Sequence, residues 1–243
     1  MVWTDFKLPL AILAIGSVVY QLYSNRDRMS FVWSVWKMFR FKMFFEVLGA
    51  LSLTSIAFLA LWEYVPIFRW GWLNLFIKGG GNIIIAPVLE SSGSPSVFVR
   101  LLPPLFFATL LIALPFMAHY EERVFRRGYH EWREIWIQSV KFGLIHLFVG
   151  VPLAAAIALI GVGFFYACKY RTALRNQNKV FASFLEETQQ VKERARDVGV
   201  RGEIRVGVVS DLEDEAVMTS TAYHTLYNSL LVLLLLILTI RAV

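Results

Sequence analysis

The sequence contains little cysteine and little charge. Its single cysteine, Cys168, excludes an intrachain disulfide and any metal site built from four cysteines. Only 17% of the 243 residues are charged and 57% are hydrophobic, whereas a soluble domain has about a quarter charged residues. The mean hydropathy of +0.57 means that the apolar excess needs a solvent other than water. The composition therefore predicts a protein embedded in a lipid bilayer.

Several catalytic motifs are also missing. The string from His130 to Glu134 lacks the second histidine of a His-Glu-x-x-His zinc motif, and no Gly-x-Ser-x-Gly nucleophile is present. The string from Gly161 to Phe164 lacks the aspartate of presenilin-like proteases. No internal repeat or broken midplane helix indicates a transporter. These absences argue against the zinc, serine and aspartyl classes of membrane protease and against a transporter.

Apolar segments recur along the chain at lengths that suit a hydrocarbon core of about 30 Å. We expect an all-α polytopic membrane protein with about six transmembrane helices. The expected spans are Leu8–Tyr23, Val47–Phe68, Phe98–Met117, Ile135–Val151, Leu153–Tyr170 and Ala222–Ile240. The fourth and fifth meet at a turn around Pro152, which predicts a tight helical hairpin.

Basic residues are concentrated in three connecting stretches, 24–45, 118–134 and 169–221. Positive residues mark the cytoplasmic side of a membrane, so these stretches are expected inside and both termini outside. The first apolar segment is expected to be a retained anchor rather than a cleaved signal peptide. The net charge of +6 is thereby explained as a topology signal, and no nucleic-acid partner is expected. A bacterial inner membrane is the expected location.

Two parts of the chain are distinguished: residues 1–97, with N-terminal membrane helices, and residues 98–243, with a cytoplasmic insertion at about 171–221. An interfacial helix is expected over Phe31–Phe45, where aromatic and basic residues alternate. The insertion is expected to be helical in its first half and to form a short strand over Glu203–Val209. External turns are expected at residues 79–81 and 91–96.

Ionisable residues beside the apolar segments are the candidate functional groups. Glu121 and Glu122 follow the third segment, and adjacent helical residues point about 100° apart, so the two carboxylates are expected to differ in role. Glu122 and Arg126 have the spacing and order of a favourable ion pair, which leaves Glu121 free to face a site. The alternative is a solvated charge run that closes a helix.

Histidines supply the other candidates. His146 lies at membrane depth one turn after Phe142, so it is either hydrogen-bonded inside the bundle or functional. His224 and Asn228 share a helix face at the entrance to the last span, as a donor pair or as a polar helix start. A carboxylate and a histidine can activate water, and a second histidine with an asparagine can stabilise an oxyanion. These are parts of a peptide-hydrolysing site without a serine or cysteine nucleophile.

In order, the motifs are Glu-Glu-x-x-x-Arg (121–126), Phe-x-x-x-His (142–146) and His-x-x-x-Asn (224–228). This order resembles the CPBP family of intramembrane proteases, which includes the type II CAAX prenyl endopeptidases and their Abi-like bacterial relatives. The resemblance covers the chain from the third span onward. The gap between His146 and His224 is long for the family, and the insertion accounts for it.

The resemblance implies an endopeptidase that cleaves a membrane-associated or membrane-proximal peptide. It implies that Glu121 activates water with His146, that His224 and Asn228 stabilise the oxyanion, and that a supporting set flanks them. The supporting residues are Glu122, Arg126 and Phe142. Zinc is not obligatory but has three potential ligands in Glu121, His146 and His224. The alternative function is a non-catalytic membrane adaptor or immunity protein that retains the fold.

Overall fold

The computed structural model describes residues 7–71, 97–197 and 209–242, and within these ranges the secondary structure is helical, without strands. This confirms the expected all-α class. The α-helices are α1 (Lys7–Ser24), α2 (Met29–Lys37), α3 (Phe41–Tyr64), α5 (Val97–Phe125), α6 (Trp132–Ile145), α7 (Leu153–Asp197) and α8 (Val209–Ala242). Short 3-10 helices adjoin them: η2 (Arg26–Arg28), η3 (Pro66–Arg69) and η5 (His146–Val149).

Four of these helices are long and apolar enough to cross a membrane. Their spans are Phe41–Tyr64, Pro103–Phe125, Leu153–Lys179 and Leu212–Ile237. In the described part of the chain, the expectation of six spans is therefore corrected to four. The described apolar part of α1 covers only Ile12–Ser24. The α6 helix has 14 residues, or about 21 Å at 1.5 Å per residue, and ends where the chain turns at Gly150 with a φ of +90°.

Helix α3 shows why the protein needs lipid around it. Only 6% of its apolar window is buried against the rest of the protein, and the window's mean hydropathy is 2.0. Leu53, Ile56 and Leu59 are each at least 60% exposed. Hydrocarbon can solvate such a helix because all its backbone groups are bonded internally. The structure thus supports a multi-pass membrane protein.

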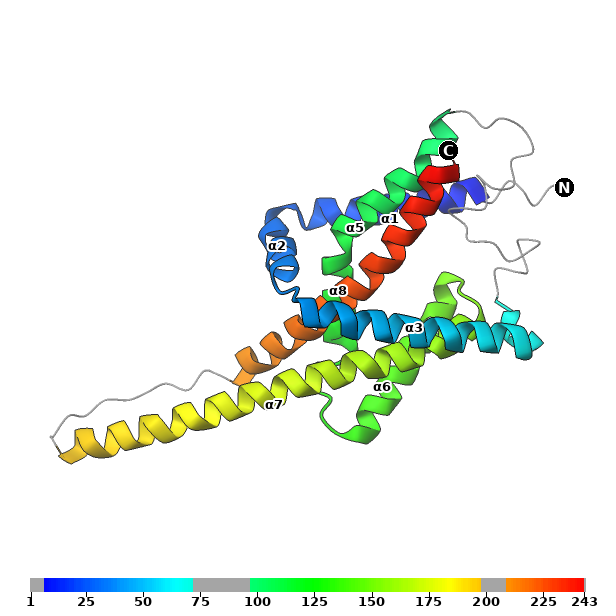
Figure 1. The fold of residues 1–243 in the computed structure, drawn as a ribbon. Coiled ribbons are helices and arrows are strands. Elements are labelled where there is room, and N and C mark those ends of the chain that lie inside the picture. The colour runs from blue at the N-terminus through cyan, green and yellow to red at the C-terminus, as the bar shows by residue number, and fades with distance from the viewer. Residues whose placement is uncertain (1–6, 72–96, 198–208, 243) are drawn as a thin grey trace.

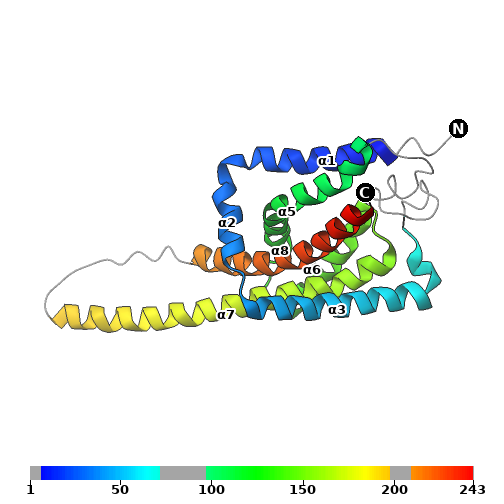
Figure 2. The ribbon, with the colours of Figure 1, turned by 45° about the horizontal axis from the view of Figure 1, so that its top comes forward.

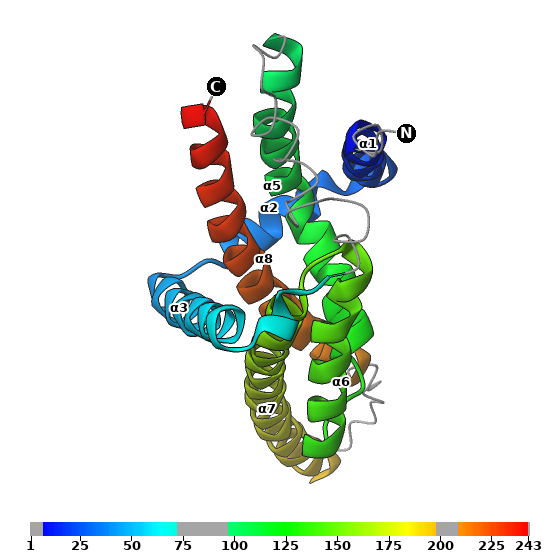
Figure 3. The same cartoon turned by 90° about the vertical axis from the view of Figure 1, so that its right-hand side faces the viewer.

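The remaining helices pack as pairs around a common core. Helices α6 and α7 form the expected hairpin, and α5 packs along α8 (Figure 1). Helix α8 also contacts α7, and α3 lies along α7 (Figure 2). In Figure 3, α5 and α8 extend upward, away from the part of the bundle that contains α6 and α7. Helices α5, α6, α7 and α8 therefore meet in one region, where the motif residues lie.

The structure changes one expectation for the connecting regions, extends another and leaves the rest untested. The expected interfacial helix is two helices, because α2 ends at Lys37 and α3 begins at Phe41. The first half of the insertion is helical as expected, but it continues α7 without a break as far as Asp197, beyond the bundle (Figure 1). The expected strand, apart from Val209 at the start of α8, lies outside the described residues. So do the expected turns at 79–81 and 91–96.

Candidate functional site

The site begins at the last turn of α5, where two adjacent glutamates face different surroundings. Glu122 is 0% exposed, and the side chain of Glu121 keeps 30% exposure. The adjacent positions lie about 100° apart around the helix, so Glu122 is fully buried against α8 while Glu121 lies nearer the surface. The two carboxylates therefore have separate environments.

Glu122 is held by three partners. Its Oε1 accepts a hydrogen bond from Nδ1 of His224 at 2.9 Å, and its Oε2 accepts one from the Ser220 hydroxyl at 2.5 Å. Arg126 Nε lies 3.4 Å from Oε2 as an ion pair. Ser220 and His224 are one turn apart on α8, so a single carboxylate spans both. The Glu122–Arg126 pair agrees with the spacing of the sequence, and the bonds to α8 make Glu122 a link between helices.

The bond to Glu122 determines what His224 can do. An ionised carboxylate only accepts hydrogen bonds, so Nδ1 of His224 carries the hydrogen. Its Nε2 accepts a hydrogen bond in the neutral ring and donates one only in the imidazolium form. Glu122 and Arg126 make an electroneutral group, which is the favourable balance for buried charges. Glu122 thus fixes the orientation of the imidazole and leaves Nε2 for chemistry.

Glu121 faces that second nitrogen. Its Oε2 lies 3.8 Å from Nε2 of His224, beyond hydrogen-bond distance. The same oxygen is buried and has no hydrogen-bond partner among the described residues. A water molecule about 2.8 Å from both atoms would bridge them at a bent angle of about 85°. The pair is therefore arranged to hold a water between a carboxylate and an imidazole.

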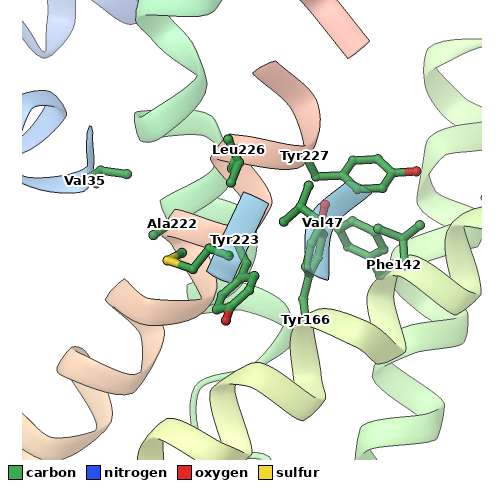
Figure 4. Packing of buried hydrophobic residues seen from close by; sticks show 10 residues of the cluster. Val35, Val47, Phe142, Tyr166, Ala222, Tyr223, Leu226 and Tyr227 are labelled. Atoms are coloured by element: carbon green, nitrogen blue, oxygen red, sulfur yellow. The ribbon is translucent and has the colours of Figure 1, made fainter. Parts of the chain in front are cut away.

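Aromatic rings enclose the imidazole. Tyr166 of α7 stacks on His224 with ring centroids 4.4 Å apart and planes at 23°. The Phe142 ring of α6 is nearly perpendicular to the His224 ring, with centroids 5.6 Å apart. The guanidinium of Arg126 lies over the Phe142 ring at 5.2 Å. Figure 4 shows Phe142 and Tyr166 converging with Tyr227 and Val47 in the core. Phe142 therefore contacts both His224 and Arg126.

His146 contacts Phe142 at the margin of this cluster, and Asn228 follows His224 by one turn on α8. The Nδ1–H of His146 donates to the Phe142 carbonyl at 2.7 Å, which leaves Nε2 as the basic nitrogen of the neutral ring. The His146 ring meets Phe142 at 5.0 Å. In the described part of the chain, neither His146 nor Asn228 has a side-chain hydrogen bond to the glutamates. Of the predicted residues, the structure brings together Glu121, Glu122, Arg126 and His224, with His146 reaching them through Phe142.

Glu121, His146 and His224 are the candidate ligands for a metal ion. No group of three His, Cys, Asp or Glu side chains that could hold a metal ion occurs within the described ranges. The set of Glu121, His146 and His224 therefore does not fit zinc in this conformation, since a zinc site needs its ligands at about 2 Å from one point. No step below uses a metal.

A second polar cluster escaped the sequence analysis. Glu46 of α3 accepts a hydrogen bond from the Tyr223 hydroxyl and pairs with Lys169 of α7 at 2.9 Å. The cluster joins α3, α7 and α8 on the side of α8 next to His224. A glutamate inside an apolar run was the available signal. Ser220 and Tyr166 were also missed, and their isolated sequence positions give no comparable signal.

Comparisons with models of protein families, with characterised proteins and with solved structures found no match to this chain. The likeness to the CPBP proteases therefore rests on the three sequence motifs.

Proposed function

We propose that the protein is an intramembrane endopeptidase that cleaves a membrane-associated or membrane-proximal peptide with an activated water. The observation that carries this proposal is the alignment of Glu122, His224 and Glu121. One carboxylate fixes Nδ1 of the imidazole, and the other lies 3.8 Å from Nε2. A histidine oriented by one carboxylate, beside a second carboxylate oxygen that has no hydrogen bond, is an arrangement suited to general acid–base catalysis.

The reaction follows from the roles of these atoms. Glu121, assisted by His146, takes a proton from the water, and the hydroxide adds to the scissile carbonyl carbon. The Nε2–H of the His224 imidazolium and the Asn228 amide donate to the oxyanion, which stabilises the tetrahedral intermediate. Glu121 then returns the proton to the leaving amine as the C–N bond breaks. Glu122 and Arg126 keep His224 oriented and the buried charges balanced.

The proposed substrate approaches from the membrane or its cytoplasmic surface. Glu121 and Glu122 lie four and three residues from the end of the apolar span that finishes at Phe125. Arg123, Arg126 and Arg127 mark that end of the span as the cytoplasmic one. The site then opens near the cytoplasmic face. A peptide beside a membrane anchor would reach it without crossing the bilayer.

The test compares peptide termini in membranes from cells that make the wild type, Glu121→Gln or His146→Ala. The wild type is expected to generate new termini in membrane-associated proteins, and both variants should generate none at equal expression. Glu63→Gln is the matched control, because Glu63 is an exposed glutamate at the far end of α3 that pairs with Arg69. Identical termini in the wild type and Glu121→Gln would refute the protease and favour the adaptor, which needs no activated water.

A further inference from the structure

Tyr166 packs directly against His224 and has no role in the reaction described above. It lies on α7, is 0% exposed, and stacks face to face on the imidazole at 4.4 Å. Its ring also meets Phe142 at 5.9 Å and Tyr227 at 6.1 Å. The tyrosine therefore forms one wall of the proposed site.

The hydroxyl of Tyr166 is buried and has no hydrogen-bond partner among the described residues. A buried polar group without a partner is unfavourable, and native proteins retain few of them. Packing alone would be served as well by phenylalanine, which has the same ring. Figure 4 shows the hydroxyl end pointing away from α7 into the core with Val47 and Tyr227. The substrate could therefore supply the missing hydrogen-bond partner of this hydroxyl.

We propose that Tyr166 is a further catalytic residue, whose phenol donates a hydrogen bond to the scissile carbonyl oxygen of the substrate. This inference rests on the proposed function and adds a donor to it. An oxygen that accepts from two donors, each about 2.8 Å away, accommodates donors up to about 5.6 Å apart. The centroids of the Tyr166 and His224 rings lie 4.4 Å apart, which is within that range. The phenol and Nε2–H of His224 can thus share one oxyanion.

The other unpartnered atoms of the cluster complement this donor. Glu121 Oε2 and two nitrogens of Arg126 are also buried without hydrogen bonds in the described part of the chain. A carboxylate without a partner can bind the attacking water, and a phenol without one can bind the oxygen that becomes negative. A neutral phenol suits this task because it donates without adding a charge to the electroneutral group.

The test uses Tyr166→Phe, which keeps the stacked ring and removes only the hydroxyl. Tyr170→Phe is the matched control: this tyrosine lies one turn further along α7, is 1% exposed, and packs in a separate cluster with Ala216 and Val217. Its hydroxyl is also buried. Each variant is purified into liposomes of phosphatidylethanolamine and phosphatidylglycerol. The probe is a fluorogenic peptide that spans the cleavage sequence defined by the termini comparison.

Loss of one oxyanion donor lowers kcat about 100-fold or more, so Tyr166→Phe is expected to lose about this much kcat with little change in KM. Tyr170→Phe should stay within about twofold of the wild type, and both should unfold at or above the wild-type temperature. A Tyr166→Phe kcat within about threefold of the wild type would overturn the inference. This result is also expected if a water molecule, and not the substrate, is the hydrogen-bond partner of the hydroxyl. If Glu121→Gln is then inactive, the proposed function stands; if Glu121→Gln is fully active, the function itself fails.

Discussion

The Glu122–Arg126 pair gives the most quantitative prediction for stability. Both side chains are almost completely buried, at 0% and 1% exposure. In Glu122→Gln, the amide still has an oxygen and an NH2 to offer Ser220 and His224, but the buried charge of Arg126 loses the carboxylate with which it pairs. Breaking such a pair from one side costs about 3–5 kcal/mol. Arg126→Gln is expected to cost a similar amount, because Glu122 then keeps only the imidazole as a countercharge.

The assay is thermal unfolding in detergent micelles, followed by the fluorescence of the eight tryptophans. A loss of about 3–5 kcal/mol corresponds to a fall in Tm of about 6–20 °C for a chain of this size. The double variant Glu122→Gln/Arg126→Gln removes both charges and should be more stable than the sum of the single losses predicts, by about 1–3 kcal/mol. Arg123→Gln is the control, since Arg123 is exposed on the same turn of α5.

Additive single effects, or single losses no larger than that of Arg123→Gln, would refute the reasoning. Either result would mean that water or lipid headgroups reach Arg126, and that the pair is not buried in the folded protein. The cluster around His224 would then be open, and Glu122 could not fix the imidazole as described.

Other variants test the packing and the links between helices by the same unfolding assay. Gly143→Ala places a Cβ 2.5 Å from a carbonyl oxygen of α7 and should cost about 1–3 kcal/mol, whereas Gly161→Ala meets nothing within 4 Å; equal Tm values for the two would contradict the close α6–α7 contact. Ser220→Ala removes a hydroxyl bond to a buried carboxylate and should cost about 1.5–3 kcal/mol; an unchanged Tm would show that Glu122 does not need it. Glu46→Gln weakens a partly exposed pair with Lys169 and should cost about 1 kcal/mol or less; a loss as large as that of Glu122→Gln would contradict this ranking.

Local patterns in the sequence predicted a substantial part of the fold. Apolar run length identified the four membrane helices, and the turn at Pro152 identified the α6–α7 hairpin. The four-residue spacing of Glu122 and Arg126 gave their ion pair. Each of these features depends on residues that are close together in the sequence. Local pattern is sufficient for such features because helix geometry fixes the spacing.

The rest depended on which helices meet. The expectation that α6 spans the membrane failed because apolar composition does not reveal where a helix stops, and η5 with Gly150 ends it early. The bond between Glu122 and His224 joins residues 102 positions apart. Ser220 and Tyr166 belong to no motif, and only the approach of α7 and α8 to α5 makes them partners of the site. The expected convergence of His146 with the glutamates likewise concerned tertiary placement, and the structure places His146 against Phe142.

The central claim is that Glu121, opposite Nε2 of His224, activates water for peptide cleavage. The most direct measurement is kcat of purified wild type and Glu121→Gln in liposomes, with the fluorogenic peptide as substrate and Tm as the check on folding. General base catalysis contributes about 10²–10⁴-fold, so the variant should lose at least about 100-fold in kcat while its Tm stays at the wild-type value. A variant that folds and cleaves within about twofold of the wild type would contradict the account.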